Sequence, residues 1–385
     1  MMMVSAVMAV RDEIGWIERA VTSVLEQDAP GVDLEVLVVD GGSTDGTREV
    51  LQELSARDPR LRVLDNPHGL TPHAFNTGLR ESTADYVCIL GSHASYDRDY
   101  VRVCLEELER TGATGCSGRV ILEPAGDSLA AQLSAWTLGS PFASSGRSFR
   151  TAPQGFADTI PYPVFRRQPL VELGGYNERL ARNQDNDMNQ RLRAAGHRLY
   201  LTWRTSCRYR AQPGPRELMR YAYRNGYWNF LTVRENRRAM RLRHFMPLLF
   251  VACVLLLGLA ALAAVALGDG TLAAVLALLA AAGVGLHLAA GLAEGIRTAW
   301  RARRPGPLLL PACILGFHAS YGAGTLAALL GLRRREPRQG QGQAHREPQL
   351  AELGERLRDH RVTDHHDEQA AGEDRLRGHP GSPPP

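Results

Sequence analysis

The sequence predicts an α/β domain with a mostly parallel sheet, followed by a helical region that crosses a membrane. Three observations support this expectation. Short apolar runs alternate with amphipathic helical patterns over residues 1–235, three long apolar stretches fill residues 245–332, and residues 333–385 are polar, charged and end in prolines. A segment of this last composition buries too little apolar surface to fold. We therefore expect three parts with these boundaries, the last a disordered charged tail.

Strand and helix patterns alternate from the N-terminus onwards. The strand candidates are VSAVMAV (4–10), LEVLVVD (34–40), LRVLDNP (61–67) and YVCILGS (86–92). The helix candidates are residues 14–27, 45–58 and 71–81, and Asp45 is the expected N-cap of the second. This alternation implies right-handed crossovers and a sheet that helices cover on both faces.

Polar residues follow three of these strands. They are Arg11-Asp12-Glu13, Asp40-Gly41-Gly42-Ser43 and Gly91-Ser92-His93. Ligands of such sheets bind at the carboxyl ends of the strands, so we expect the three clusters to meet in one crevice. The glycines of VVDGGSTDGT (38–47) match neither a dinucleotide-binding nor a P-loop pattern, and a purely structural turn explains this stretch equally well.

Overall composition excludes some classes of protein. The formal net charge of +4 does not indicate a nucleic-acid partner. The six cysteines form no CxxC pair or metal-ligand cluster, which predicts a reduced, intracellular soluble part. The N-terminal apolar stretch has no preceding basic region and is too short for a signal peptide, so it is interpreted as a buried strand.

The three apolar stretches cover residues 245–268, 271–296 and 307–332. At about 1.5 Å per residue each is longer than the roughly 30 Å core of a bilayer. A buried helical bundle is the alternative, but the first stretch has no charge and offers no polar face.

Arginines set the expected orientation. They precede the first stretch and follow the second, while the loop GDG (268–270) has no positive charge. The positive-inside rule then places the soluble domain in the cytoplasm of a multi-pass inner (plasma) membrane protein. Arg333, Arg334 and Arg335 also favour the cytoplasm, which three full crossings forbid. Either the tail is outside, or the third stretch is re-entrant around its glycines, so we expect two or three spans.

The ordered motifs of residues 4 to about 235 resemble family 2 glycosyltransferases of the GT-A fold. The motifs are VSAVMAVRDE, VVDGGSTDGT, FNTGLRESTADYVCILGSHASYDRDYV, LGGYNE and NQDNDMNQRLRAAG. NPHGLTPHAFNTG, RNQD and YRNGYWN are similar to the succinoglycan-biosynthesis type, a bacterial exopolysaccharide branch. The resemblance implies an inverting hexosyltransferase that moves sugar from a nucleotide-sugar to a saccharide acceptor, often lipid-linked. The Gln-x-x-Arg-Trp box of processive synthases is absent from the sequence, which favours addition of one sugar per encounter.

The resemblance also implies a catalytic base. In the family, the acid of a Glu-Asp or Gln-Asp pair at the head of a helix deprotonates the acceptor hydroxyl. Here the pair is Gln184-Asp185, so Asp185 is the expected general base, kept ionised by the free N–H groups of the helix start. A simple N-cap is the alternative for Asp185, and Asp187 is expected to pair with Arg191 on the helix surface.

Further residues carry substrate-binding roles by the same resemblance. Asp40 matches the acid that contacts the nucleotide base, and Asn76 matches the asparagine of the helix after the third strand. The other expected substrate contacts are Val10, Arg11, Glu13, Ser92, Gly174, Gly175 and Gln184. Local capping by Asn76 and a plain turn at the glycines of LGGYNE are the alternatives. Arg191 and Arg193 are candidate phosphate partners, although arginines on a helix face are commonly solvated.

The metal site departs from the family pattern. The family usually has Asp-x-Asp where this chain has Gly91-Ser92-His93, and that motif binds the divalent cation, Mg²⁺ or Mn²⁺. His93 is the expected ligand, helped by the diphosphate and water. A nearby acid, Asp97 or Asp99, is the second possibility, and neutralisation of the charge by arginines is the third. An inert His93 is nearly as well supported.

Two classes of function follow. The first is a glycosyltransferase with a nucleotide-sugar donor, a lipid-linked or saccharide acceptor and membrane lipid as its partners, and with basic residues from Arg234 to Arg243 on lipid phosphates. The second is a non-catalytic membrane protein that binds a nucleotide-sugar or a partner in a glycan assembly complex. Gly91, where the family has an acid, is the direct support for the second.

Overall fold

A nine-stranded sheet runs through the soluble part of the computed structural model, which describes residues 2–146 and 148–332. The expected disordered tail lies outside these residues. The strand order is β3-β2-β1-β4-β8-β6-β9-β5, and β7 pairs with β9. The strands are β1 (Met2–Val10), β2 (Val32–Asp40), β3 (Leu61–Asp65), β4 (Tyr86–Gly91), β5 (Ala94–Tyr96), β6 (Gly115–Glu123), β7 (Gly155–Phe156), β8 (Val164–Arg166) and β9 (Leu199–Arg210).

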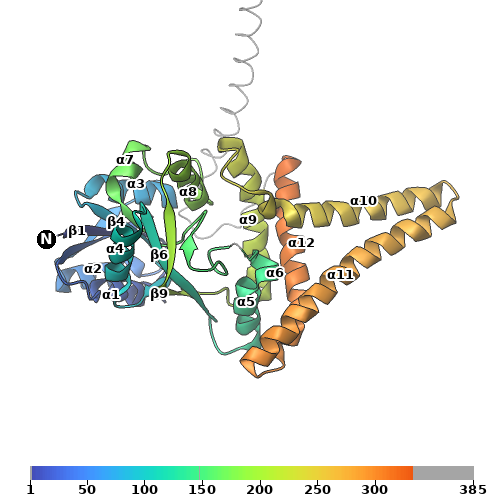
Figure 1. Cartoon of the computed structure of the whole chain (residues 1–385), viewed down its shortest axis with the longest axis horizontal. Coiled ribbons are helices and arrows are strands. Elements are labelled where there is room, and N and C mark those ends of the chain that lie inside the picture. Colours follow the sequence, from blue (N-terminus) through green and yellow to red (C-terminus); the bar gives the residue numbers. More distant parts are fainter. Residues whose placement is uncertain (1, 147, 333–385) are drawn as a thin grey trace, which may run out of the picture. The chain divides into compact units, whose positions relative to one another are not determined.

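Helices cover this sheet and continue beyond it (Figure 1). In the soluble part they are α1 (Ile17–Leu25), α2 (Thr47–Arg57), α3 (Thr71–Glu81), α4 (Tyr100–Thr111), α5 (Leu129–Gly139), α6 (Pro141–Ser144), α7 (Arg167–Glu172), α8 (Gln184–Ala194) and α9 (Pro215–Glu235). Three apolar helices follow: α10 (Met246–Ala266), α11 (Gly270–Ala302) and α12 (Leu310–Leu329).

The first half of the sheet is parallel, as the alternating pattern predicts. Strands β1, β2, β3 and β4 contain the four predicted apolar runs, and β1 pairs in parallel with both β2 and β4. Helix α3 matches its predicted bounds. Helix α1 begins at Ile17 instead of Ile14, because the carbonyl of Glu13 accepts hydrogen bonds from the amides of Trp16 and Ile17 and closes a turn there.

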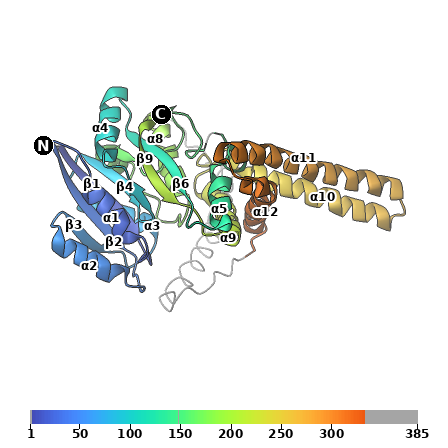
Figure 2. The same cartoon turned by 90° about the horizontal axis from the view of Figure 1, so that it is seen from below.

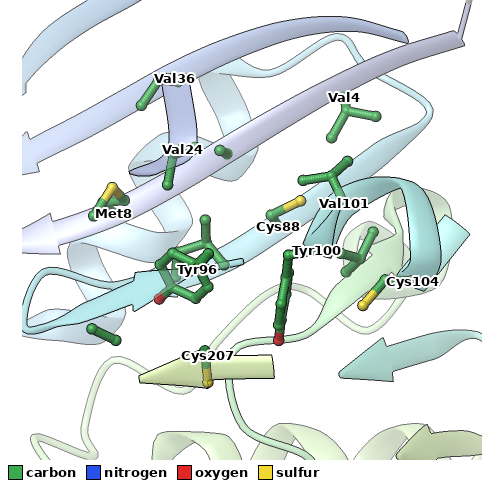
Figure 3. Packing of buried hydrophobic residues seen from close by; sticks show 14 of the residues in the cluster. Val4, Met8, Val24, Val36, Cys88, Tyr96, Tyr100, Val101, Cys104 and Cys207 are labelled. Atoms are coloured by element: carbon green, nitrogen blue, oxygen red, sulfur yellow. The ribbon is translucent and has the colours of Figure 1, made fainter. Parts of the chain in front are cut away.

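Both faces of the parallel strands are buried, which explains why their sequences are apolar almost without interruption. On one face Val4 and Met8 of β1 pack with Val24 of α1 and Tyr100 of α4 in a single core (Figure 3). On the other face Val7 packs with residues of α3 and α8. The parallel strands therefore form a rigid base whose carboxyl ends have fixed positions.

The second half of the sheet was not predicted from sequence. Strand β8 pairs antiparallel with β4 and with β6, and β6 pairs in parallel with β9. These strands are short or interrupted, and β8 contributes only three residues. Their effect is to bring the end of β9, with Tyr209 and Arg210, beside the end of β4.

Helices α10 and α11 run side by side as a hairpin that projects from the rest of residues 2–332 (Figures 1 and 2). All three of the predicted apolar stretches are helical, and each is long and apolar enough to cross a membrane. The most apolar windows of α10 and α11 are only 6% buried, whereas that of α12 is 44% buried. Two of the three helices therefore expose their apolar surface, while the third is half covered by protein.

Helix α12 packs lengthwise against α9. A Cβ atom on Gly226 of α9 would collide with the carbonyl oxygen of Tyr321, and one on Gly324 of α12 would collide with that of Tyr223. The hydroxyl of Thr325 donates to the carbonyl of Gly226 at 2.9 Å. Small residues thus allow the two backbones to approach closely, in the manner of packed membrane helices.

This packing joins the two parts that the sequence suggests are separate. Helices α5, α9 and α12 share one buried cluster that includes Leu138, Leu218 and Ile314. Residues 1–333 accordingly form a single compact unit. Helix α12 is also continuous from Leu310 to Leu329, so the expected alternative of a re-entrant segment broken at its glycines is not what forms.

Candidate active site

A cavity of about 1070 Å³ lies at the carboxyl ends of β1 and β4 and continues to α8, α9 and the apolar helices. Two of the three predicted clusters meet in it, since Arg11, Glu13, Gly91, Ser92 and His93 all line its wall. Val10, Gln184 and Asp185 line it as well. The cavity is therefore the crevice that the strand ends predict, extended towards the membrane helices.

Asp185 enters this cavity from the first turn of α8. Asn183, the residue before the Gln184-Asp185 pair, has a left-handed backbone with φ of 61°. Its side-chain amide donates to the Asn229 side chain of α9 at 3.1 Å. The Asp185 carboxylate accepts the amide N–H of Asn186 at 2.8 Å. A tight, anchored turn thus aims the carboxylate into the cavity.

Two opposing effects set the pKa of Asp185. Desolvation raises its pKa above 3.8, and this outweighs the hydrogen bonds from backbone amides and the nearby Arg150, which act in the opposite direction. The helix start was expected to keep Asp185 ionised, and its backbone N–H groups do favour the charged form. Burial prevails because the carboxylate faces a cavity lined by Tyr176 and other side chains, and not bulk water. The carboxylate is consequently a stronger base than an ordinary aspartate.

Glu13 and His93 form a second group in the cavity. Their Oε1 and Nδ1 atoms are 3.8 Å apart, and the edge of the Tyr209 ring lies against the imidazole. Burial raises the pKa of Glu13 to about 7. Desolvation, and secondarily Arg182, lowers the pKa of His93 below 6.5, so the imidazole is neutral and offers a free electron pair. The exposed part of the His93 ring faces the cavity.

A carboxylate beside a neutral imidazole is a donor set that Mn²⁺ or Mg²⁺ accepts when phosphate oxygens complete the coordination. Groups of three or more His, Cys, Asp or Glu side chains that could hold a metal are absent from residues 2–146 and 148–332. Asp97 and Asp99, the predicted substitutes, bond to the hydroxyls of Ser206 and Thr205 and do not line the cavity. Glu13, expected only to line the nucleotide, is the acid that reaches His93.

Asp40 does not reach the cavity wall. Its side chain is buried and accepts hydrogen bonds from the hydroxyl of Ser43 at 2.6 Å and from Arg48 at 3.2 Å. These bonds satisfy the carboxylate inside the turn after β2. Contact between Asp40 and a nucleotide base remains a prediction, and the contacts that the structure gives to this acid stabilise the turn.

Asn76 and the glycines of LGGYNE also lie elsewhere. The Asn76 amide clamps the turn by donating to the carbonyl of Tyr176 at 2.9 Å and accepting its N–H at 2.7 Å. Gly174 and Gly175 have positive φ and line a separate hollow of about 380 Å³ near Asp187. Asn76 packs against Gly175 on one side of the turn, and the two glycines face the separate hollow on the other. Asn76, Gly174 and Gly175 therefore do not line the cavity that contains Asp185.

Arg191 and Arg193, the predicted phosphate partners, instead pair with carboxylates of the protein. Arg191 pairs with Asp187 at 2.8 Å, as expected, and also donates to the carbonyls of Leu173 and Gly175. Asp187 is buried, however, and does not lie on the helix surface where it was predicted. Arg193 lies 3.5 Å from Asp158. Neither lines the main cavity.

Three further arginines line the cavity although the sequence assigned them no role: Arg150, Arg182 and, at the end of β9, Arg210. Arg150 follows the loop after α6, and Arg182 precedes α8. Tyr221 and Asn225 of α9, one helical turn apart, contact them. Residues 140–160 carry no recognisable motif and form mostly loop, so nothing local in the sequence marked Arg150. Arg182 stands within the motif RNQD, in which the family resemblance assigns roles only to Gln184 and Asp185.

Comparisons with known proteins agree with this architecture. The family described as Glycosyl transferase family 2 matches residues 5–174. The succinoglycan biosynthesis protein ExoA of Rhizobium meliloti is 32% identical over 311 residues, covering 79% of this chain and 88% of that protein. Glycosyltransferase AglE of Haloferax volcanii is 28% identical over 200 residues, covering 51% of this chain and 63% of its own.

The fold is shared with solved structures. One of them is the mannosyltransferase PcManGT from Pyrobaculum calidifontis in complex with GDP-Man and Mn²⁺, with a TM-score of 0.52, 19% identity, and coverage of 86% of this chain and 88% of that chain. The sheet, its cavity and this likeness define a GT-A-type glycosyltransferase fold followed by apolar helices. The chain belongs to glycosyltransferase family 2, and is an enzyme of that class.

Proposed function

We propose that this protein transfers one hexose from a nucleotide-sugar to a lipid-linked saccharide during the synthesis of a bacterial exopolysaccharide, with inversion at the anomeric carbon. The likeness to the succinoglycan biosynthesis protein over most of both chains supports the pathway class. The observation that carries the mechanism is that Asp185, Glu13 and the membrane helices all line one cavity.

Asp185 acts as the general base. An inverting transfer needs a carboxylate that takes the proton of the acceptor hydroxyl while the diphosphate leaves from the opposite side of the sugar. The raised pKa of Asp185 suits this role, because a more basic carboxylate accepts the proton more readily. The hydrogen bond between Asn183 and Asn229 anchors the turn, and the turn holds the Asp185 carboxylate in a fixed orientation towards the acceptor.

Glu13 and His93 would hold a divalent cation. When bound, such a cation neutralises negative charge on the leaving diphosphate. The chain supplies the carboxylate oxygen of Glu13 and the electron pair of the neutral His93 ring. This assignment replaces Asp97 and Asp99 as candidate ligands.

The membrane side of the cavity supports a lipid-linked acceptor. Its wall includes Phe250 of α10, His287 of α11, and His318 and Tyr321 of α12. His318 donates from Nε2 to the carbonyl of Ala143, which can only accept, so its Nδ1 accepts from His287. The Nδ1 of His287 is then a buried acceptor without a protein partner. A hydroxyl-bearing head group on a lipid fits a wall of this kind.

The arrangement of the helices favours two full crossings. The hairpin of α10 and α11 projects away from α9, whereas α12 runs along α9 and across the base of the hairpin in both views (Figures 1 and 2). A helix of 21 residues such as α10 spans about 30 Å. With α12 lying at the membrane surface, the arginines before α10, after α11 and after α12 are all on the cytoplasmic side of the plasma membrane.

The test is sugar transfer in membranes that contain the full chain. A panel of labelled nucleotide-sugars is supplied, the lipid extract is analysed, and Asp185→Asn is compared with the wild type. We expect transfer to fall by about 10²–10⁴-fold, the usual cost of losing a general base. The control is Asp127→Asn, because Asp127 is exposed at the surface. The neighbouring Asp187 is buried, and its replacement would also affect folding.

The non-catalytic alternative predicts a different result. It rests on Gly91, since the family acid that would help bind the cation is missing there. Binding of a nucleotide-sugar without transfer to any lipid extract, in wild type and Asp185→Asn alike, would favour that alternative. Equal transfer by both proteins would remove Asp185 from its role.

A further inference from the structure

Arg150 lines the cavity and forms no ion pair with a carboxylate of the described residues. Its Nη2 donates to the hydroxyl of Tyr221 at 3.2 Å, and its guanidinium stacks over the Phe149 ring at 4.4 Å. The Nε atom is buried and makes no hydrogen bond. Burial of a guanidinium with an unused donor is costly unless an anion satisfies it.

Arg182 lies near the same tyrosine, Tyr221. Its Nη1 donates to the Asn225 side chain at 3.1 Å, and its guanidinium is 6.0 Å from the centre of the Tyr221 ring. Tyr221 and Asn225 stand one turn apart on α9, so a rigid helix face fixes both guanidinium groups. The two cations are thus presented together, by neutral partners only.

The other arginines of the cavity wall have acidic neighbours. Arg11 and Arg243, which also line the wall, lie 3.6 Å from Asp12 and from Asp158 respectively. Arg210, the remaining arginine of the described wall, forms no ion pair with the residues that the structure describes but acts electrostatically on Glu13. Arg150 and Arg182 form no ion pair with any carboxylate among residues 2–146 and 148–332. Two guanidinium groups without an ion pair among these residues therefore line the same cavity.

The charges also have a definite position in the site. Arg150 acts electrostatically on Asp185, and its guanidinium lies 5.8 Å from the centre of the Tyr209 ring, which contacts His93. Arg182 acts on His93. The pair is accordingly close enough to the proposed base and to His93 at the end of β4 to interact with both, in the cavity where a sugar joined to phosphate would be placed.

We propose that Arg150 and Arg182 form a binding site for a diphosphate group. This inference rests on the proposed function. Two guanidinium groups match a diphosphate in charge and in hydrogen-bond donors, since each can bind phosphate oxygens through a planar fork, whereas one arginine would suffice for a single phosphate. The buried Nε of Arg150 supplies a further donor.

Two molecules carry this chemistry to the cavity. One is the nucleoside diphosphate of the donor, which approaches along the strand ends, and the other is a lipid diphosphate, which approaches from α10 and α12. If the donor is the source, the arginines stabilise the negative charge that grows on the leaving group, in addition to any cation at Glu13 and His93.

The experiment measures binding to the purified full-length chain in detergent with EDTA present. The first arm compares UDP with UMP, with GDP and GMP run alongside, and the second compares farnesyl diphosphate with farnesyl phosphate. The variants are Arg150→Gln with Arg182→Gln, and Arg150→Lys with Arg182→Lys, which keeps the charge but removes the fork. Arg204→Ala, whose guanidinium pairs with Glu106 and Glu107 outside the cavity, is the control.

We expect the wild type and the control to prefer the diphosphate in at least one arm, and the glutamine pair to lose about tenfold or more of that affinity while the monophosphate changes little. The lysine pair should fall between them. The arm that responds identifies the source of the diphosphate. An unchanged preference for diphosphate in both arms, in folded glutamine and lysine pairs, would overturn the assignment.

This result is separable from the test of the proposed function. Asp185→Asn should lose transfer and keep its preference for the diphosphate, because Asp185 is no part of the arginine pair. Loss of that preference in the arginine variants, together with absence of transfer by the wild type, would support the binding site and contradict the enzyme.

Discussion

The Nδ1 atom of His93 lies 3.8 Å from the Oε1 atom of Glu13, across the carboxyl ends of β4 and β1. The two residues are 80 positions apart by number, and they meet because β1 and β4 are parallel neighbours in the sheet. From the local sequence, only His93, Asp97 and Asp99 were candidate ligands, and the two aspartates do not line the cavity. The sheet supplies the carboxylate that Gly91 lacks, and several predictions depend on this pairing.

Replacement of Glu13 should weaken cation binding. In Glu13→Gln the charged oxygen is lost while the shape is kept, so the Mn²⁺ concentration that gives half-maximal transfer should rise by about tenfold or more. Cation titration of transfer in membranes measures this. Asp99→Asn is the matched control, because Asp99 bonds to Thr205 outside the cavity. A larger effect at Asp99 than at Glu13 would restore the acid originally considered for this role.

Cation binding should depend on pH near neutrality. The pKa of Glu13 is raised to about 7 by burial, so the carboxyl is neutral below that pH and charged above it. A cation needs the charged form, and cation affinity should therefore fall as the pH drops through about 7. Calorimetric titration of Mn²⁺ with UDP between pH 5.5 and 8.5, about 1.5 units either side of that value, measures it. The step should vanish in Glu13→Gln and persist in Asp185→Asn; its persistence in Glu13→Gln would assign it to another group.

Transfer should have an acidic limit set by Asp185. Its pKa is raised above 3.8 by desolvation, and a general base works only when it is deprotonated. The rate at saturating cation should therefore decline on acidification at a higher pH than an ordinary aspartate would give. The pH profile of transfer by Glu13→Gln at high Mn²⁺ isolates this limb, since the titration of Glu13 is absent there. A rate that stays constant well below the ordinary range of aspartate would contradict the role of Asp185.

The contact between α9 and α12 should be intolerant of bulk. Gly226→Leu would force a side chain against the carbonyl of Tyr321, at an expected cost of about 3 kcal/mol or more. The yield of folded protein in detergent and its thermal unfolding measure this. Gly258→Leu on α10 is the matched control, because nothing lies within 4 Å of a Cβ atom there. Equal stability of the two variants would show that α9 and α12 are not held together as described.

The ends of the apolar helices should lie on predictable sides of the membrane. Gly268→Cys, at the tip of the hairpin, should react with a membrane-impermeant maleimide in intact cells, whereas Leu332→Cys should react only after permeabilisation. The six native cysteines are first replaced by serine or alanine, so that the maleimide can react only at the introduced position. Labelling of position 332 from outside would mean that α12 completes a third crossing.

Much of this fold was readable from periodicity alone. The four parallel strands, helix α3 and the three apolar helices have long, consistent patterns, and burial on both faces of a sheet or contact with lipid leaves such patterns in the chain. Strands β5, β7 and β8 left none, because two or three residues are too few for a period to show and their pairing depends on partners distant in sequence.

The candidate site divides in the same way. Asp185, Glu13 and His93 stand beside recognisable motifs, and all three line the cavity. Asn76, Gly174 and Gly175 carry equally clear motifs, yet they clamp a turn that faces another hollow. A motif records that a residue type is needed at a position, whereas hydrogen bonds to distant partners decide which way its side chain points.

The sequence by itself determined the class of the protein, the positions of its parallel strands along the chain, the presence of its apolar helices and the residue at the head of α8. Only the tertiary structure decided that Glu13 is the acid beside His93, that Arg150 and Arg182 stand together without carboxylates, and that α12 packs on α9. The physical reason is that hydrophobic periods and turn residues act over a few positions. The charge balance of a site is instead the sum over side chains that only the folded chain brings together.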